Sequence, residues 1–119
     1  MNFYILQKLK RKVEKDIDMC DIDKLKERLG RKKYKNLNDH FYIVDFLEYS
    51  LKMDKFDVFE FLMDYSGFDI DTQYLDQGNY TLLMKIICRD MNIERILRVL
   101  NYTKNINLIS NFGETALYL

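Results

Sequence analysis

The chain has 119 residues and a mass of 14.5 kDa, which suits one domain and is too short for a typical two-domain enzyme. Apolar residues form 48% of it and aromatic residues 14%, so the composition excludes the disordered chains of low hydrophobicity and high charge. Nineteen basic side chains balance nineteen acidic ones, and the chain has no proline and four glycines. Because the turn residues that many short strands need are scarce, we predict an all-α fold.

The start of the chain does not have the pattern of a secretion signal. Its early apolar stretch, residues 3–6, is followed at once by a group of cations, and Cys20 and Cys88 lie far apart. No apolar run approaches the roughly 20 residues that cross a bilayer. We therefore expect an intracellular, cytoplasmic protein with reduced thiols and without a transmembrane segment.

The N-terminal part predicts two amphipathic helices. Residues 3–15 place apolar side chains at spacings of three and four, namely Leu6, Leu9 and Val13. A shorter helix follows between Asp21, a candidate N-cap, and Gly30, which we expect in the left-handed conformation that ends many helices. Residues 31–38 are predicted to be a basic connector. We assign the whole of 1–38 to a helical N-terminal cap.

A pair of longer apolar helices is predicted next. Asp39 is a candidate N-cap for a helix over 39–52, and a second helix is expected over 56–65 until Gly67 ends it. The inward residues recur at helical spacing: Ile43, Phe46, Leu47 and Leu51 in the first helix, Val58, Phe59, Leu62 and Met63 in the second.

A similar pair follows an extended connection over 69–78. Thr81 opens a helix over 82–90, in which we expect Cys88 to be a small core residue. A helix over 93–102 follows, with an apolar side formed by Ile96, Leu97, Val99 and Leu100. Another extended stretch ends at Gly113.

These pairs contain an internal repeat. Thr81-Leu82-Leu83-Met84 and Thr115-Ala116-Leu117-Tyr118 occupy equivalent places 34 residues apart, close to the period of about 33 of ankyrin repeats. Ankyrin connectors have the form Asp-Val-Asn-x-x-Asp-x-x-Gly-x-Thr-Pro-Leu-His, and the stretch from Asn105-Ile106-Asn107 through Gly113 and Thr115 to Leu117 falls in that register. The chain resembles an ankyrin-repeat protein, with divergent repeats similar to those of large DNA viruses.

The resemblance covers 53–119, extends less clearly to 39–52 and is not found before residue 39. Leu82 and Ala116 stand where the family has proline, and Met84 and Tyr118 where it has histidine. The resemblance implies an ankyrin-type stack of repeats over about 39–71, 72–107 and a partial 108–119. Because the last repeat is incomplete, we expect an uncovered face at the C-terminal end, suited to self-association or to continuation of a longer array.

No residue pattern indicates catalysis or a cofactor. His40 is the single histidine, and no spacing of histidine and cysteine resembles a zinc site. The stretch 69–80 fails as a calcium loop, since Tyr74 stands where that loop needs glycine. Four scattered glycines form no phosphate loop. We expect no metal, no cofactor, no small-molecule substrate and no enzymatic activity.

The resemblance instead implies a protein-protein interaction module, a scaffold or adaptor whose partner docks on the connector tips. The tips are adjacent projections of a stiff stack, so binding them orders few side chains. They comprise Tyr74, Leu75, Asp76, Gln77 and Asn79 in one connector and Ser110, Asn111, Phe112 and Glu114 in the next.

Charge is distributed unevenly along the chain. Residues 1–35 contain twelve Lys and Arg against six Asp and Glu, a net charge of +6, and residues 36–119 contain seven against thirteen, a net charge of −6. An alternative function is therefore contact with nucleic acid or an anionic membrane through the basic N-terminal helices. We favour a solvated cap that docks on acidic repeats, because acidic residues interrupt the cluster and no aromatic-basic stacking motif accompanies it. Nucleic acid is not the partner we expect.

Overall fold

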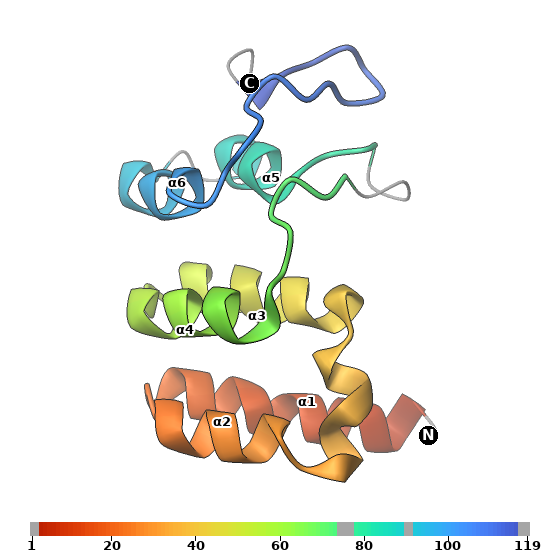
Figure 1. Ribbon diagram of the computed structural model, residues 1–119, viewed down its shortest axis with the longest axis vertical. Helices are drawn as coiled ribbons and strands as arrows, with labels where there is room; N and C mark the ends of the chain where they lie inside the picture. Colours follow the sequence, from red (N-terminus) through yellow and green to blue (C-terminus); the bar gives the residue numbers. More distant parts are fainter. Residues whose placement is uncertain (1–2, 74–77, 90–91, 117–119) are drawn as a thin grey trace. The chain divides into compact units, whose positions relative to one another are not determined.

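The computed structural model describes residues 3–73, 78–89 and 92–116. Within these ranges it contains six α-helices, one 3-10 helix and no strand, which confirms the predicted all-α class (Figure 1). The chain divides into two compact units, Met1–Phe68 and Asp69–Leu119. None of the described helices combines the length and apolar character that crossing a bilayer requires.

Two packed helices begin the N-terminal unit. α1 (Phe3–Asp18) runs one turn beyond the predicted end, and α2 (Ile22–Leu29) follows it. The apolar side chains that both helices bury are Leu9, Val13, Ile17, Leu25 and Leu29. Asp21 is the N-cap of α2 as predicted, because its Oδ1 accepts a hydrogen bond of 3.1 Å from the backbone N–H of Lys24.

The segment after α2 differs from the prediction. Gly30 is right-handed, with φ −78°, because it continues the turn of α2 and donates its backbone N–H to the carbonyl oxygen of Lys26 at 3.1 Å. Arg31 is extended, and the 3-10 helix η1 (Lys32–Asn38) follows it. The predicted basic connector is thus a helix, and its Tyr34 and Leu37 are fully buried. Residues three apart lie on the same side of a 3-10 helix. The amide of Asn38 holds η1 against α2 by donating to the carbonyl oxygen of Leu29 at 2.8 Å.

A helix pair completes the N-terminal unit. α3 (His40–Lys52) and α4 (Phe56–Ser66) match the two predicted helices, and α3 also packs against α1 and η1. Every inward residue that we predicted is buried: Ile43, Phe46, Leu47, Leu51, Val58, Phe59, Leu62 and Met63. Gly67 ends α4 with φ +63°, a left-handed conformation that costs glycine least. The predicted cap and the first helix pair therefore share one core.

An ion pair fastens α1 to α2 inside this unit. Asp16 is 3% exposed, and its Oδ2 accepts a hydrogen bond of 2.6 Å from Nε of Arg28. The guanidinium also donates through Nη1 to the hydroxyl of Tyr34 at 3.0 Å. The hydrogen bond to Asp16, followed by that to Tyr34, raises the pKa of Arg28 above its usual value. One side chain thus joins α1, α2 and η1.

The C-terminal unit contains the second helix pair, α5 (Leu82–Arg89) and α6 (Ile93–Leu100). Thr81 precedes α5 as predicted, and its Oγ1 accepts a hydrogen bond of 3.3 Å from the backbone N–H of Met84. In α6 the amide oxygen of Asn92 accepts from the backbone N–H of Arg95 at 3.2 Å. Both helices are therefore capped at the N-terminus by side chains.

Two core predictions for this pair are wrong. Cys88 is exposed, because the buried part of α5 ends at Ile86 and the last turn faces solvent. Leu97 is 55% exposed, whereas Val99 is buried. Residues two apart on an α-helix are separated by about 200°, so both cannot face the same neighbour. Only one side of α6 is covered within the described residues.

We expect Arg28→Leu to lower the free energy of unfolding by about 3 kcal/mol, because it leaves the buried carboxylate of Asp16 without its cation. Urea unfolding of the full chain measures this. The control is Arg31→Leu, which breaks the exposed pair with Glu27, at 2.6 Å, and should cost about 0.5 kcal/mol. Equal losses in the two variants would show that the buried pair has no special role.

Candidate binding surface at the connector tips

Two connectors of the C-terminal unit lie side by side and are joined by hydrogen bonds (Figure 1). The first connector, residues 69–81, leads into α5, and the second, residues 101–116, follows α6. We call the region where they meet, around residues 78–80 and 109–114, the tip surface. The predicted tip residues Tyr74, Leu75, Asp76 and Gln77 lie outside the described residues.

Asp71 holds the base of the second connector. Its carboxylate accepts hydrogen bonds from the backbone N–H groups of Lys104 at 3.2 Å and Asn105 at 3.0 Å. Each bond involves an ionised acceptor and is therefore stronger than a neutral one. The chain direction after α6 is thus set by a side chain of the preceding connector.

Gln73 links the two connectors between the Asp71 contact and the tip surface. Its Nε2 donates to the carbonyl oxygen of Asn79 at 3.0 Å, within its own connector, and to that of Ile109 at 2.8 Å in the other. Because one amide group satisfies a carbonyl on each side, the spacing between the connectors is fixed at this level.

Asn79 and Asn111 meet at the tip itself. The side-chain amide of Asn79 donates to Oδ1 of Asn111 at 2.7 Å, and the backbone N–H of Asn111 donates to the carbonyl oxygen of Gly78 at 2.8 Å. Gly78 has φ +68° and Asn79 has φ +57°, the left-handed region in which glycine and asparagine occur most readily. The first connector can therefore turn tightly enough to approach its neighbour.

Tyr80 and Glu114 form the polar link nearest to α5. The phenol of Tyr80 donates to Oε1 of Glu114 at 2.6 Å, and this hydrogen bond is the main cause that raises the pKa of Tyr80 to about 12. The ring of Phe112 meets that of Tyr80 edge to face, with 6.5 Å between ring centroids. A Cβ at Gly78 would lie 3.0 Å from the ring of Phe112, so the glycine also makes room for that ring.

The predicted tip residues of the second connector differ in role. We expected Ser110 on the exposed tip, but it is 6% exposed and its hydroxyl oxygen accepts hydrogen bonds from the backbone N–H groups of Phe112 and Glu114. Ser110 therefore shapes the turn, as serine often does when it competes for backbone donors. Glu114 is half-buried, whereas Asn111 is exposed and Phe112 is 74% exposed.

The two connectors also contain residues whose role the sequence pattern did not indicate. Ile109 is 59% exposed beside the predicted tip, and Asp71, Gln73 and Tyr80 make the bonds that join the connectors. Asp71 could have been found by comparing the two connectors residue by residue, since it has the same place as Asn107. Nothing in the sequence distinguishes Gln73, whose role depends on which backbone it meets.

Cysteines and possible metal ligands do not gather into a site among the described residues. Cys20 and Cys88 are free and exposed, and the described residues bring together no group of three His, Cys, Asp or Glu side chains that could hold a metal ion. The face expected to support self-association depends on residues 117–119, which lie outside the described residues.

No family model, no curated protein and no solved structure matches the chain.

We expect the phenol of Tyr80 to ionise near pH 12. Since the fold raises this pKa above the unfolded value of about 10, the stabilising contribution is complete below pH 10 and is lost as pH rises through 12. Alkaline titration of phenolate absorbance should therefore show one fewer high-pH tyrosine in Tyr80→Phe than in the parent chain.

Glu114→Ala tests the cause of this shift. It removes the oxygen that accepts the hydrogen bond of the phenol, which is the main cause, together with the negative charge that opposes ionisation, so the Tyr80 pKa should fall toward 10. Tyr49 is the internal reference, because burial and then Asp18 raise its pKa to about 12, and Glu114→Ala should leave it unchanged. A Tyr80 titration that does not move would contradict the assigned hydrogen bond.

Proposed function

We propose that the chain is a protein-protein interaction module of the ankyrin-repeat type, without catalytic activity, whose tip surface binds a partner protein. The observation that carries the proposal is the set of bonds between the two connectors. They join residues 32, 33, 34 and 36 positions apart, and these separations bracket the period of about 33 expected for successive ankyrin repeats.

Local geometry at equivalent positions also supports a repeat. After α4 the side chain of Asp69 accepts a hydrogen bond of 3.0 Å from the backbone N–H of Asp71, and after α6 Asn105 accepts one of 3.0 Å from Asn107. Short acidic and amide side chains favour such bends because they bond the backbone two residues on. The same turn thus follows each helix pair at the same register.

The tip surface suits partner binding because it is rigid before the partner arrives. Asp71 accepts hydrogen bonds from the backbone of the second connector, Gln73 donates to it, and the side chain of Asn79 donates to that of Asn111. Little conformational entropy is therefore lost on association. Phe112 supplies an exposed aromatic ring at its centre, and aromatic side chains are frequent anchors in protein interfaces. Ile109 adds apolar area beside it.

We expect Phe112→Ala to weaken partner binding while leaving helicity unchanged. Affinity capture from an extract of cells that make the protein, followed by isothermal titration with the purified partner, should show at least a tenfold loss of affinity. Phe3→Ala is a matched control, because Phe3 is 75% exposed and Phe112 74% exposed, and it should retain the parent affinity. A partner that binds both variants equally well does not use the tip surface.

We also propose that the pairs α3–α4 and α5–α6 are repeats of the same kind. The two helices of such a repeat cover each other and should open together. Leu62→Ala removes a fully buried side chain of α4 and should lower hydrogen-exchange protection in α3, which packs against α4, as well as in α4 itself. Protection of α3 that stays at the parent level would contradict a cooperative repeat.

A further inference from the structure

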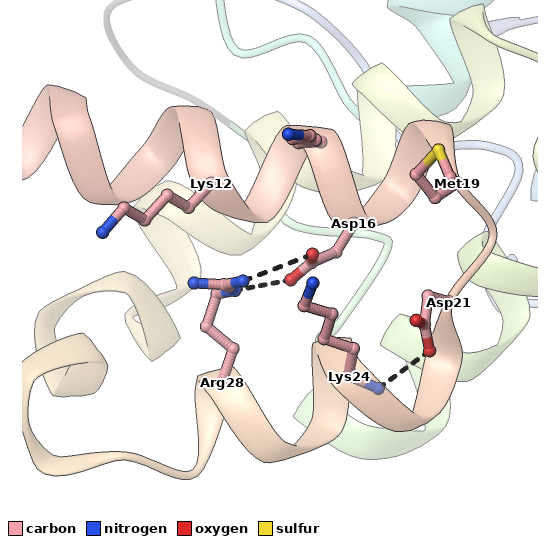
Figure 2. A pocket seen from close by; sticks show the side chains of 7 residues that line it. Lys12, Asp16, Met19, Asp21, Lys24 and Arg28 are labelled. Carbon is pink, nitrogen blue, oxygen red and sulfur yellow. Dashed lines mark hydrogen bonds and ion pairs between the residues drawn. The ribbon is translucent and has the colours of Figure 1, made fainter.

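A basic cavity lies between α1 and α2 in the N-terminal unit (Figure 2). Its volume is about 420 Å³, large enough for a small phosphorylated molecule. Its lining comprises Lys12, Lys15, Asp16, Met19, Asp21, Lys24 and Arg28. All of these residues belong to the N-terminal unit, and none of them is a residue of the tip surface.

The two carboxylates of the lining are already engaged by the protein. Asp16 accepts two hydrogen bonds from Arg28, at 2.6 and 3.5 Å, and Asp21 accepts the backbone N–H of Lys24 at 3.1 Å. Four cationic side chains face these two anionic ones. The lining therefore carries a net charge of +2 after its two carboxylates are counted.

The three lysines supply the excess charge. Among the described residues, the ammonium groups of Lys12, Lys15 and Lys24 have no hydrogen-bond or ion-pair partner. Figure 2 shows Lys12 reaching from α1 and Lys24 from α2 on either side of the Arg28–Asp16 pair. Repulsion between such groups favours an anion that brings them together.

Arg28 differs from the lysines because it is held in place. Asp16, itself 3% exposed, and the hydroxyl of Tyr34 fix the guanidinium at the cavity wall. A planar guanidinium that is fixed in place and flexible ammonium groups beside it together provide suitable hydrogen-bond donors for phosphate oxygens. The buried pair thus both fastens α1 to α2 and orients one wall of the cavity.

We propose that this cavity is a binding site for a ligand with a multiply charged phosphate group. The phosphate oxygens are bound by Lys12, Lys15 and Lys24. The guanidinium of Arg28 positions these oxygens. A phosphate dianion matches the net charge of the lining. The phosphate belongs either to a free metabolite or to a lipid headgroup, because the donors recognise the same oxygens in both.

The test is titration of the full chain with sodium tripolyphosphate, and separately with phosphatidylcholine vesicles that contain or lack phosphatidylinositol bisphosphate. The cavity variant is Lys12→Gln with Lys15→Gln and Lys24→Gln. The control variant is Lys8→Gln with Lys26→Gln and Lys35→Gln, which removes the same charge from exposed positions outside the cavity. Circular dichroism verifies that both variants fold.

We expect the cavity variant to lose at least tenfold in affinity and the control variant less than threefold. If the chain binds tripolyphosphate but not the vesicles, the ligand is a free phosphate compound. If it binds only the vesicles that contain phosphatidylinositol bisphosphate, the ligand is a lipid headgroup. Equal losses of affinity in the two variants would mean that only net charge matters, and this would overturn the proposal. Absence of binding to both probes would also overturn it. If the cavity variant does not fold, Lys24→Gln alone should lower the affinity about threefold, and parent affinity would overturn the site.

Discussion

A helix of eight residues cannot bury an apolar face by itself, and three of the helices in the described part of the chain are of that length. Each helix therefore depends on the element packed against it. α2 is covered by α1 and η1, and α5 is paired with α6. The short helices also explain why polar caps recur at Asp21, Thr81 and Asn92: with few internal hydrogen bonds, the unpaired N–H groups of the first turn form a large share of each helix.

Polar side chains decide how these short elements are joined. In the N-terminal unit Arg28 connects Asp16 to Tyr34, so three consecutive helices share one hydrogen-bonded group. In the C-terminal unit Asp71 and Gln73 likewise join the two connectors, whose described residues lie outside the α-helices. Connecting segments are ordinarily the mobile parts of a fold. Here the bonds between them supply the rigidity on which the proposed partner binding depends.

The uneven charge of the chain corresponds to two different surfaces. The basic excess of residues 1–35 includes the cations that line the cavity between α1 and α2, where three ammonium groups lack partners within the described residues. The tip surface of the C-terminal unit has a different character, since its exposed residues are aromatic, aliphatic and amide side chains around Phe112. One surface is suited to an anion and the other to a protein, and neither proposal requires the other to hold.

The sequence by itself determined the six α-helices of the described residues, the inward residues of α3 and α4, and the ends at Asp21 and Gly67, because helical spacing and capping act within a few residues. It also indicated Asn111 and Phe112 as exposed tip residues. Only the tertiary structure decided that Gly30 is right-handed, that Tyr34 is buried and that Cys88 is exposed. The same holds for Gln73 and Ser110 at the tip surface. These outcomes depend on which neighbour covers a side chain and which backbone carbonyl it meets, and a local pattern contains no information about either.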